Sequence, residues 1–124
     1  MVLQDIGTIA KVDRFGEEVC SHGTARTDIA LLCDDILIGI EAKLTDWQRA
    51  IVQGLRNRYC VDRSYIAIWD GGYVDSACAT AQRFGLGVFV VGTQGVRLAC
   101  ESELNEPEHE LRSRMVSQLK EVGK

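Results

Sequence analysis

Short apolar segments separated by polar turns run along the chain from residue 27 onward. Residues 27–33 and 36–44 are rich in isoleucine and leucine, and only Asp34 and Asp35 separate them. This pattern is typical of two strands joined by a tight turn. Further apolar segments, bounded by polar residues or glycine, predict strands at residues 63–69, 86–91 and 96–99.

A helix is predicted after the second of these strands. Four residues with apolar side chains recur there at intervals of four, which places them near one face of a helix: Trp47, Ile51, Leu55 and Tyr59. Thr45 is a suitable N-cap, and Asp46 in the first turn would complement the helix dipole. Two more helices are expected, at residues 74–84 and at residues 106–121 with Pro107 near the first turn.

The order of these elements predicts the fold class. Strand, helix, strand, helix and strand after a hairpin give an α/β fold, a mixed sheet with helices on both faces. Residues 3–20 match helix and strand patterns equally weakly, and we assign them mostly to strand. A chain of 124 residues is long enough for one core, so we expect a single domain over residues 1–124.

The composition argues against membrane-spanning, secreted, disulfide-bonded and zinc-binding proteins. No segment approaches the roughly 20 apolar residues of a membrane span, and the N-terminus lacks the features of a secretory signal. Five cysteines lie among apolar neighbours without any Cys-x-x-Cys pair, as expected of reduced thiols rather than of disulfides or a zinc site. We therefore expect a cytoplasmic protein with no membrane partner.

Charge is unevenly distributed, although the net charge is −4. A net acidic chain argues against a nucleic-acid-binding protein that is basic over its whole surface. Residues 43–63, however, hold five basic residues against Asp46 and Asp62. The arginines at 49, 56 and 63 in this basic block either contact phosphates or belong to a solvated helix face.

The predicted hairpin places two acidic side chains opposite each other. If Asp34 and Asp35 form a two-residue turn, Cys33 pairs with Ile36 and, further along, Asp28 faces Glu41. Their β-carbons would then lie about 4.5–5.5 Å apart on one face of the hairpin. Lys43, two residues beyond Glu41, projects from the same face.

Two facing carboxylates at the edge of a covered face repel each other and are costly to desolvate. A divalent cation compensates directly, because Mg²⁺ favours one or two carboxylates together with water and phosphate oxygens. The same geometry also allows two diagonal ion pairs on a solvated face, Arg26 with Glu41 and Asp28 with Lys43. A three-residue loop would move Asp28 away from Glu41. Local geometry leaves these possibilities open.

A resemblance favours the metal site. Thr27-Asp28-Ile29-Ala30 and Glu41-Ala42-Lys43, followed by a glutamine-bearing helix and a Tyr-Ile-Ala-Ile strand, resemble the core of the PD-(D/E)XK nuclease superfamily. This superfamily includes restriction endonucleases, Holliday-junction resolvases and RecB-type nucleases. The resemblance covers roughly residues 20–92. It implies a restriction-endonuclease-like fold, a four-stranded mixed sheet with a helix on each side, and hydrolysis of DNA phosphodiester bonds with Mg²⁺ or Mn²⁺.

The resemblance also implies residue roles. Asp28 and Glu41 would be the metal-binding acids, aided by the Ala42 carbonyl, and Lys43 would be the catalytic lysine. Thr27 replaces the proline that names the motif. Many members carry a further acid on a helix before the hairpin, for which the candidates are Glu17 and Glu18.

A glutamine on the helix after the hairpin is a further candidate. RecB-type members carry Gln-x-x-x-Tyr there, whereas Gln53 and Tyr59 of this chain are six apart. Distance from the lysine in the family favours Gln53 as an ancillary catalytic residue. Helical geometry with Ile51 and Leu55 pointing inward favours Gln48 instead.

The sequence thus leads to the hypothesis of a metal-dependent nuclease that acts on DNA. Two alternatives stay open. One is a catalytically idle domain of the same fold that binds DNA or protein. The other is a structural domain whose helix at 106–121 packs on a second copy. A chain this short has little room for a separate target-recognition unit, so a homodimer or a larger assembly is also open.

Overall fold

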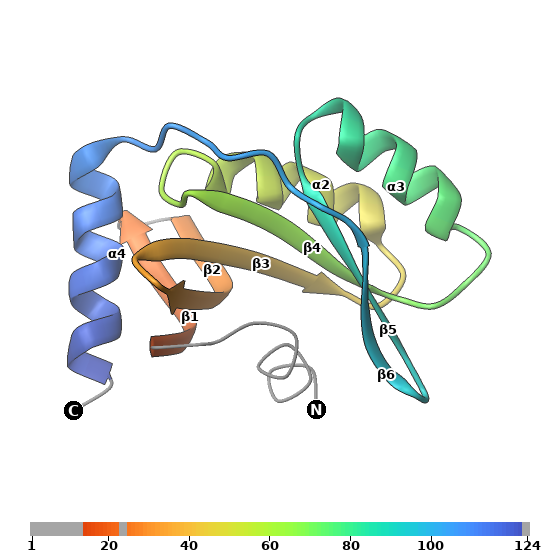
Figure 1. Ribbon diagram of the computed structural model, residues 1–124, viewed down its shortest axis with the longest axis horizontal. Helices are drawn as coiled ribbons and strands as arrows, with labels where there is room; N and C mark the ends of the chain where they lie inside the picture. The colour runs from red at the N-terminus through yellow and green to blue at the C-terminus, as the bar shows by residue number, and fades with distance from the viewer. Residues whose placement is uncertain (1–13, 23–24, 123–124) are drawn as a thin grey trace.

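A computed structural model describes residues 14–22 and 25–122 of the chain (Figure 1). In this part, one mixed sheet has the strand order β1-β2-β3-β4-β5-β6, with β3–β4 and β4–β5 parallel and the other neighbours antiparallel. The strands are β1 (Arg14–His22), β2 (Ala25–Cys33), β3 (Ile36–Lys43), β4 (Arg63–Trp69), β5 (Gly87–Gly92) and β6 (Gly95–Cys100). The helices are α2 (Trp47–Asn57), α3 (Val74–Arg83) and α4 (His109–Val122). The predicted α/β fold with a mixed sheet is confirmed.

The sheet has two buried apolar faces. On the first face, Ile66 and Val88 pack under α2 and α3, and Leu37 packs under α4. On the second face, Leu31, Ile40, Tyr65 and Phe89 form a separate buried cluster. In Figure 1, α2 and α3 lie over one end of the sheet and α4 stands beside β1 and β2 at the other.

The crossover connections explain why α2 and α3 share a face. Connections between parallel strands are right-handed in nearly all proteins, and here both advance across the sheet in the same direction, from β3 to β4 to β5. Helices α2 and α3 therefore lie against the first face, and α4 packs on the same face through Met115 and Leu119. A helix on the second face, which the resemblance also implied, is not among the described residues.

The β2–β3 hairpin has the predicted register. Cys33 pairs with Ile36 and Ile29 pairs with Ile40. Asp34 and Asp35 have φ values of 47° and 67°, as a two-residue type I′ turn requires at both central positions. This turn fixes which residues of the two strands face each other.

Helix α2 begins one residue later than expected. The N-cap is Asp46, whose carboxylate accepts a hydrogen bond of 3.3 Å from the Arg49 amide, so the assignment of Thr45 as N-cap was wrong. The helix buries Ala50, Ile51, Gly54 and Asn57. Tyr59 lies in the turn after the helix and is exposed, so it does not continue the buried stripe.

The chain from residue 101 to 108 is not helical, although 106–108 belonged to the predicted C-terminal helix. The backbone amides of Glu103, Asn105 and Glu108 donate hydrogen bonds to carbonyls of the loops and turns beside them. The first helical hydrogen bond runs from the Arg112 amide to the Glu108 carbonyl, so α4 begins directly after Glu108, at His109.

Helix α4 packs on its own sheet. Met115 and Leu119 are fully buried within this chain. The apolar face of α4 is thus already covered, and these two side chains are not available to pack on a second copy, as one alternative had suggested. Of the weakly patterned residues 3–20, residues 14–20 lie in β1, as predicted, and residues 3–13 lie outside the described part. None of the described helices is long and apolar enough to cross a membrane.

Candidate metal centre

The hairpin brings together three of the predicted site residues. Asp28 lies on β2 and Glu41 on β3, each one position beyond Ile29 and Ile40, the last pair of the β2–β3 ladder, and Ala42 follows Glu41. The Asp28 amide donates a hydrogen bond of 3.4 Å to Oε1 of Glu41. The Ala42 amide donates one of 3.2 Å to Oδ2 of Asp28. The carboxylates of Asp28 and Glu41 are thus held by each other's strands.

Helix α2 contributes a residue that the sequence pattern did not reveal. Asn57, at its last turn, is 5% exposed and donates a hydrogen bond of 2.9 Å from Nδ2 to Oε1 of Glu41. Its Oδ1 accepts a hydrogen bond of 3.1 Å from the hydroxyl of Thr27. The threonine that replaces the motif's proline therefore orients the amide that holds Glu41.

One signal could have identified Asn57. It lies four residues after Gln53, the position at which the Gln-x-x-x-Tyr pattern carries its tyrosine. Residues four apart on a helix share a flank, so a residue there faces the same strands as the glutamine.

The surroundings of Glu41 disfavour the charged form of its carboxylate. It is 2% exposed, and burial raises the pKa of Glu41 from 4.5 to about 7. The hydrogen bond from Asn57 opposes this rise in pKa, and the nearby negative charge of Asp28 adds to it. Without a cation, Glu41 therefore stays mostly protonated at pH values below about 7.

The ion pairs that were the alternative to a metal are not formed among the described side chains. Lys43 makes no ion pair with Asp28, and no described lysine or arginine is paired with either acid. The side chain of Arg26, the other suggested partner, lies outside the described part. The described surroundings therefore supply no positive charge that neutralises the two carboxylates directly.

Lys43 and Gln53 belong to the elements that carry Glu41 and Asn57, namely β3 and α2. Lys43 is half-buried at the end of β3, where it lines a small pocket of about 120 Å³ together with Ala42 and Trp69. Gln53 is half-buried, one helical turn before Asn57 and on the same flank of α2. No hydrogen bond among the described residues joins Lys43 or Gln53 to the carboxylates.

The geometric argument for Gln48 was wrong. Gln48 is exposed, because the buried stripe of α2 runs through Ala50, Gly54 and Asn57 rather than through Ile51 and Leu55 alone. The suggested further acids, Glu17 and Glu18, lie on the strand β1 and not on a helix. Their side chains are outside the described part.

The donor set fits a hard divalent cation. Within the described residues, no three His, Cys, Asp or Glu side chains cluster in a way that could enclose a metal. Two carboxylates and a backbone carbonyl leave room for water and substrate oxygens, which is how proteins commonly hold Mg²⁺. Zinc, by contrast, favours three or four nitrogen and sulfur ligands.

Comparisons with known proteins agree on the fold. The chain matches no protein-family model and no curated protein sequence. SPO1766, a protein of unknown function from Silicibacter pomeroyi, has a similar structure, with a TM-score of 0.70 and 14% identity over 88% of this chain and 73% of that chain. SfsA from Pyrococcus furiosus, solved in complex with Ca²⁺, has a TM-score of 0.50 and 13% identity over 85% of this chain and 61% of that chain. The shared property is the α/β fold.

Proposed function

We propose that this protein is a nuclease that hydrolyses DNA phosphodiester bonds with Mg²⁺ or Mn²⁺. The observation that carries this proposal is the pair of carboxylates on β2 and β3. The buried Glu41 and the partly exposed Asp28 lie side by side without a described cationic partner. The similarly folded SfsA binds Ca²⁺, another cation that prefers oxygen ligands, which supports a divalent-metal site.

Each residue of the site has a role in this proposal. Asp28, Glu41 and the Ala42 carbonyl would hold the metal. Bound Mg²⁺ supplies Lewis-acid activation of water and neutralises charge on the phosphate. Lys43, whose ammonium has no described partner, is available to orient the attacking water and to stabilise the developing negative charge.

Gln53 and Asn57 act from α2. Gln53, which shares a flank of α2 with Asn57, would hold the water or a phosphate oxygen. Asn57 is a positioning residue, because it contacts Glu41 rather than the substrate. Together the two residues couple the helix to the chemistry on the hairpin.

A catalytically idle domain of the same fold is the second candidate. The net charge of −4 favours it, and so does the absence of a third clustered acid among the described side chains. Such a domain would bind DNA or a protein partner without cutting, and it would tolerate loss of Lys43.

Cleavage assays separate these proposals. Purified protein is incubated with duplex, branched and single-stranded DNA, with Mg²⁺ or with EDTA. We expect cleavage only with the metal, and a loss of at least about 100-fold for Asp28→Asn and Lys43→Ala. Asp75→Asn, an exposed acid on α3, is the matched control and should cut like the wild type.

Two results would count against a nuclease. The first is no metal-dependent cleavage of any substrate by the wild type. The second is equal cleavage by the wild type and both variants, which would indicate a contaminating enzyme. DNA binding without cleavage supports the idle domain.

A further inference from the structure

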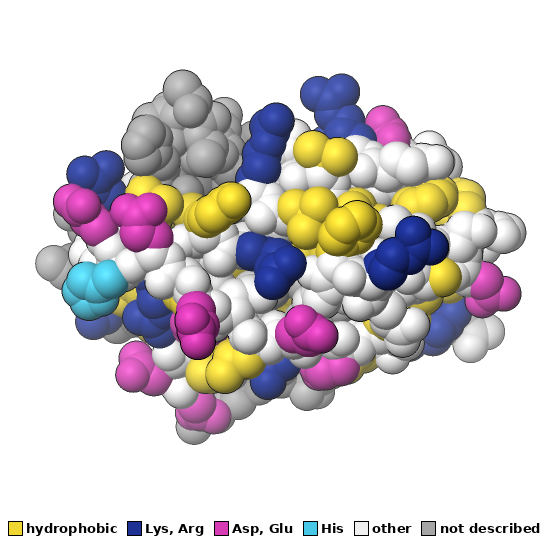
Figure 2. Space-filling view, turned by 90° about the horizontal axis from the view of Figure 1, so that it is seen from above, with side chains coloured by type: hydrophobic (Ala, Val, Ile, Leu, Met, Phe, Trp, Pro, Cys, Tyr) yellow, Lys and Arg dark blue, Asp and Glu magenta, His cyan; other side chains and the backbone are white. Residues whose placement is uncertain are grey.

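The outward face of α2 is basic on an acidic chain. The helix contains no aspartate or glutamate, and Arg49 and Arg56 are exposed and make no ion pair or hydrogen bond with described side chains. The chain as a whole has a net charge of −4. Figure 2 shows lysine and arginine side chains interspersed with hydrophobic and acidic ones on the face seen from above, so the basic character belongs to α2 itself rather than to the whole face. This local excess of positive charge favours an anionic partner.

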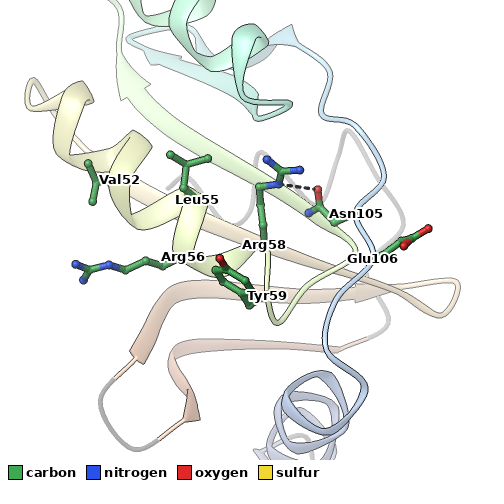
Figure 3. A pocket seen from close by; sticks show the side chains of 7 residues that line it. All are labelled: Val52, Leu55, Arg56, Arg58, Tyr59, Asn105 and Glu106. Atoms are coloured by element: carbon green, nitrogen blue, oxygen red, sulfur yellow. Dashed lines mark hydrogen bonds between the residues drawn. The ribbon is translucent and has the colours of Figure 1, made fainter.

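A groove of about 630 Å³ borders this face. It is lined by Val52, Leu55, Arg56, Arg58, Tyr59, Asn105 and Glu106 (Figure 3). Tyr59 is 67% exposed, an unusually open position for an aromatic ring. The groove therefore offers a π-surface that no described side chain covers.

One wall of the groove is rigidly held. The guanidinium of Arg58 donates a hydrogen bond of 3.1 Å to Asn105 and one of 2.8 Å to the Phe84 carbonyl. Arg56, by contrast, extends away from Asn105 and Glu106 in Figure 3. The free positive charge thus lies at one side of the groove and the Glu106 carboxylate at the other.

This polarity suggests how a nucleotide would lie. A phosphate fits beside Arg56 and is repelled from Glu106. A base is uncharged and can stack on Tyr59, with its edge toward Glu106 and the polar wall. An apolar protein segment would use Val52 and Leu55 but would leave Arg49 and Arg56 unpaired, so it matches the surface less well.

The groove and the candidate metal centre lie on adjoining sides of α2. Asn57 faces Glu41, whereas Arg56, the preceding residue, lies at the solvent edge and Tyr59 lies beyond it. A strand that leaves the acids toward the groove crosses the helix past Arg56, a path comparable to the helix diameter of about 10 Å.

We propose that this groove binds an unpaired base of the DNA strand, stacked on Tyr59, with Arg56 holding a phosphate between the groove and the metal centre. The substrate class is thus DNA with a single-stranded segment beside the cut. The inference rests on the proposed function for the direction in which the strand leaves the site. It adds a base-binding subsite that the acids and Lys43 do not require.

Binding measurements in EDTA test this subsite apart from catalysis. The anisotropy of a labelled oligothymidylate is compared with that of an abasic strand of the same length, for the wild type, Tyr59→Ala and Arg56→Ala. We expect the wild type to prefer the strand with bases about tenfold, and Tyr59→Ala to lose that preference. Arg56→Ala should weaken both strands equally and flatten the salt dependence by about 0.7 in log–log slope.

Two control variants accompany these binding measurements. Tyr59→Phe should retain the preference for bases, and Arg83→Ala, an exposed arginine on α3, should leave both affinities unchanged. Equal binding of both strands by the wild type, or an unchanged preference in Tyr59→Ala, overturns the subsite. Metal-dependent cleavage together with either result leaves the nuclease intact. The expected binding pattern without any cleavage keeps the subsite and rejects the nuclease.

Discussion

At the scale of single residues, Glu41 carries most of the argument for the proposed cation. Its carboxylate is buried beside that of Asp28, and the only described side chain that donates a hydrogen bond to it is the uncharged amide of Asn57. One amide does not offset the cost of burying charge next to a like charge. A proton can do so at low pH, and a divalent cation can do so at neutral pH.

The metal-free protein should therefore lose stability as pH rises. Because the pKa of Glu41 is about 7 in the folded state and 4.5 ordinarily, the folded state binds more protons than the unfolded state between these values. The free energy of unfolding should fall by up to about 3 kcal/mol from pH 4.5 to 7 and then level off. Urea denaturation in EDTA at several pH values measures this fall. An equally steep fall in Glu41→Gln would assign it to other groups.

The hydrogen bonds that link Thr27 to Asn57 and Asn57 to Glu41 predict a second effect, on metal binding. Removing the hydroxyl in Thr27→Val should let the Asn57 amide turn away from Glu41 and raise the Mg²⁺ concentration for half-maximal cleavage about 10-fold or more. Thr27→Ser keeps the hydroxyl and should need the same Mg²⁺ concentration as the wild type. Thr80→Val on α3, which loses a hydroxyl bonded only within its own helix, is the control. An unchanged Mg²⁺ requirement in Thr27→Val would show that the hydroxyl does not position the acid.

At the scale of elements, the register of the β2–β3 hairpin was predictable from the sequence, whereas the buried face of α2 was not. A two-residue turn with fixed ends determines the register of both strands, so Asp28 and Glu41 could be placed from the sequence. The orientation of α2 depends on Gly54, which has no side chain to mark it as buried. A β-carbon there would lie 3.2 Å from Leu86, so the helix approaches the sheet at a residue that hydropathy does not detect.

The close packing around Gly87 in β5 also predicts that this glycine cannot be replaced without a loss of stability. A β-carbon at Gly87 would lie 2.2 Å from the ring of Tyr65 and 2.9 Å from the backbone nitrogen of Ser102. Gly87→Ala should destabilise the fold by about 2 kcal/mol, because ring and backbone must both shift. Gly72→Ala, with nothing within 4 Å of the added carbon, should change stability by less than about 0.5 kcal/mol. Similar denaturation midpoints for the two variants would contradict this packing.

At the scale of the whole molecule, a partly buried ion pair reinforces the apolar packing of α4 on the sheet. Arg112 donates hydrogen bonds of 2.9–3.1 Å to the Asp62 carboxylate and one of 2.8 Å to the Asp35 carbonyl. Asp62 also accepts a hydrogen bond of 2.7 Å from the Leu37 amide. The last helix is thus connected both to the turn of the hairpin and to the start of β4.

Breaking this connection should cost more than breaking an exposed ion pair. Asp62→Asn should lower the free energy of unfolding by about 2 kcal/mol, because a charged hydrogen-bond network is lost. Glu110→Gln, which removes the exposed pair with Arg114 on α4, should cost less than about 0.5 kcal/mol. Denaturation curves of both variants give the comparison. Equal costs would mean that Asp62 does not anchor α4.

The order of elements was readable from the sequence, but several long-range contacts were not. The segment 101–108 contains Pro107 and polar residues typical of a helix start, yet its amides are used by Gly85, Asp62 and Tyr59, which are distant in sequence. Likewise Asn57, a polar residue in the last turn of α2, is buried only because Glu41 and Thr27 meet it. Local patterns carry no information about such partners.

Diffraction from crystals soaked in Mn²⁺ tests the central claim most directly. The proposal predicts one anomalous peak within about 2.0–2.2 Å of oxygens from both Asp28 and Glu41, with the peak lost in Asp28→Asn crystals. Saturating Mn²⁺ that leaves no peak between the two carboxylates, or a peak that persists in Asp28→Asn, would contradict it.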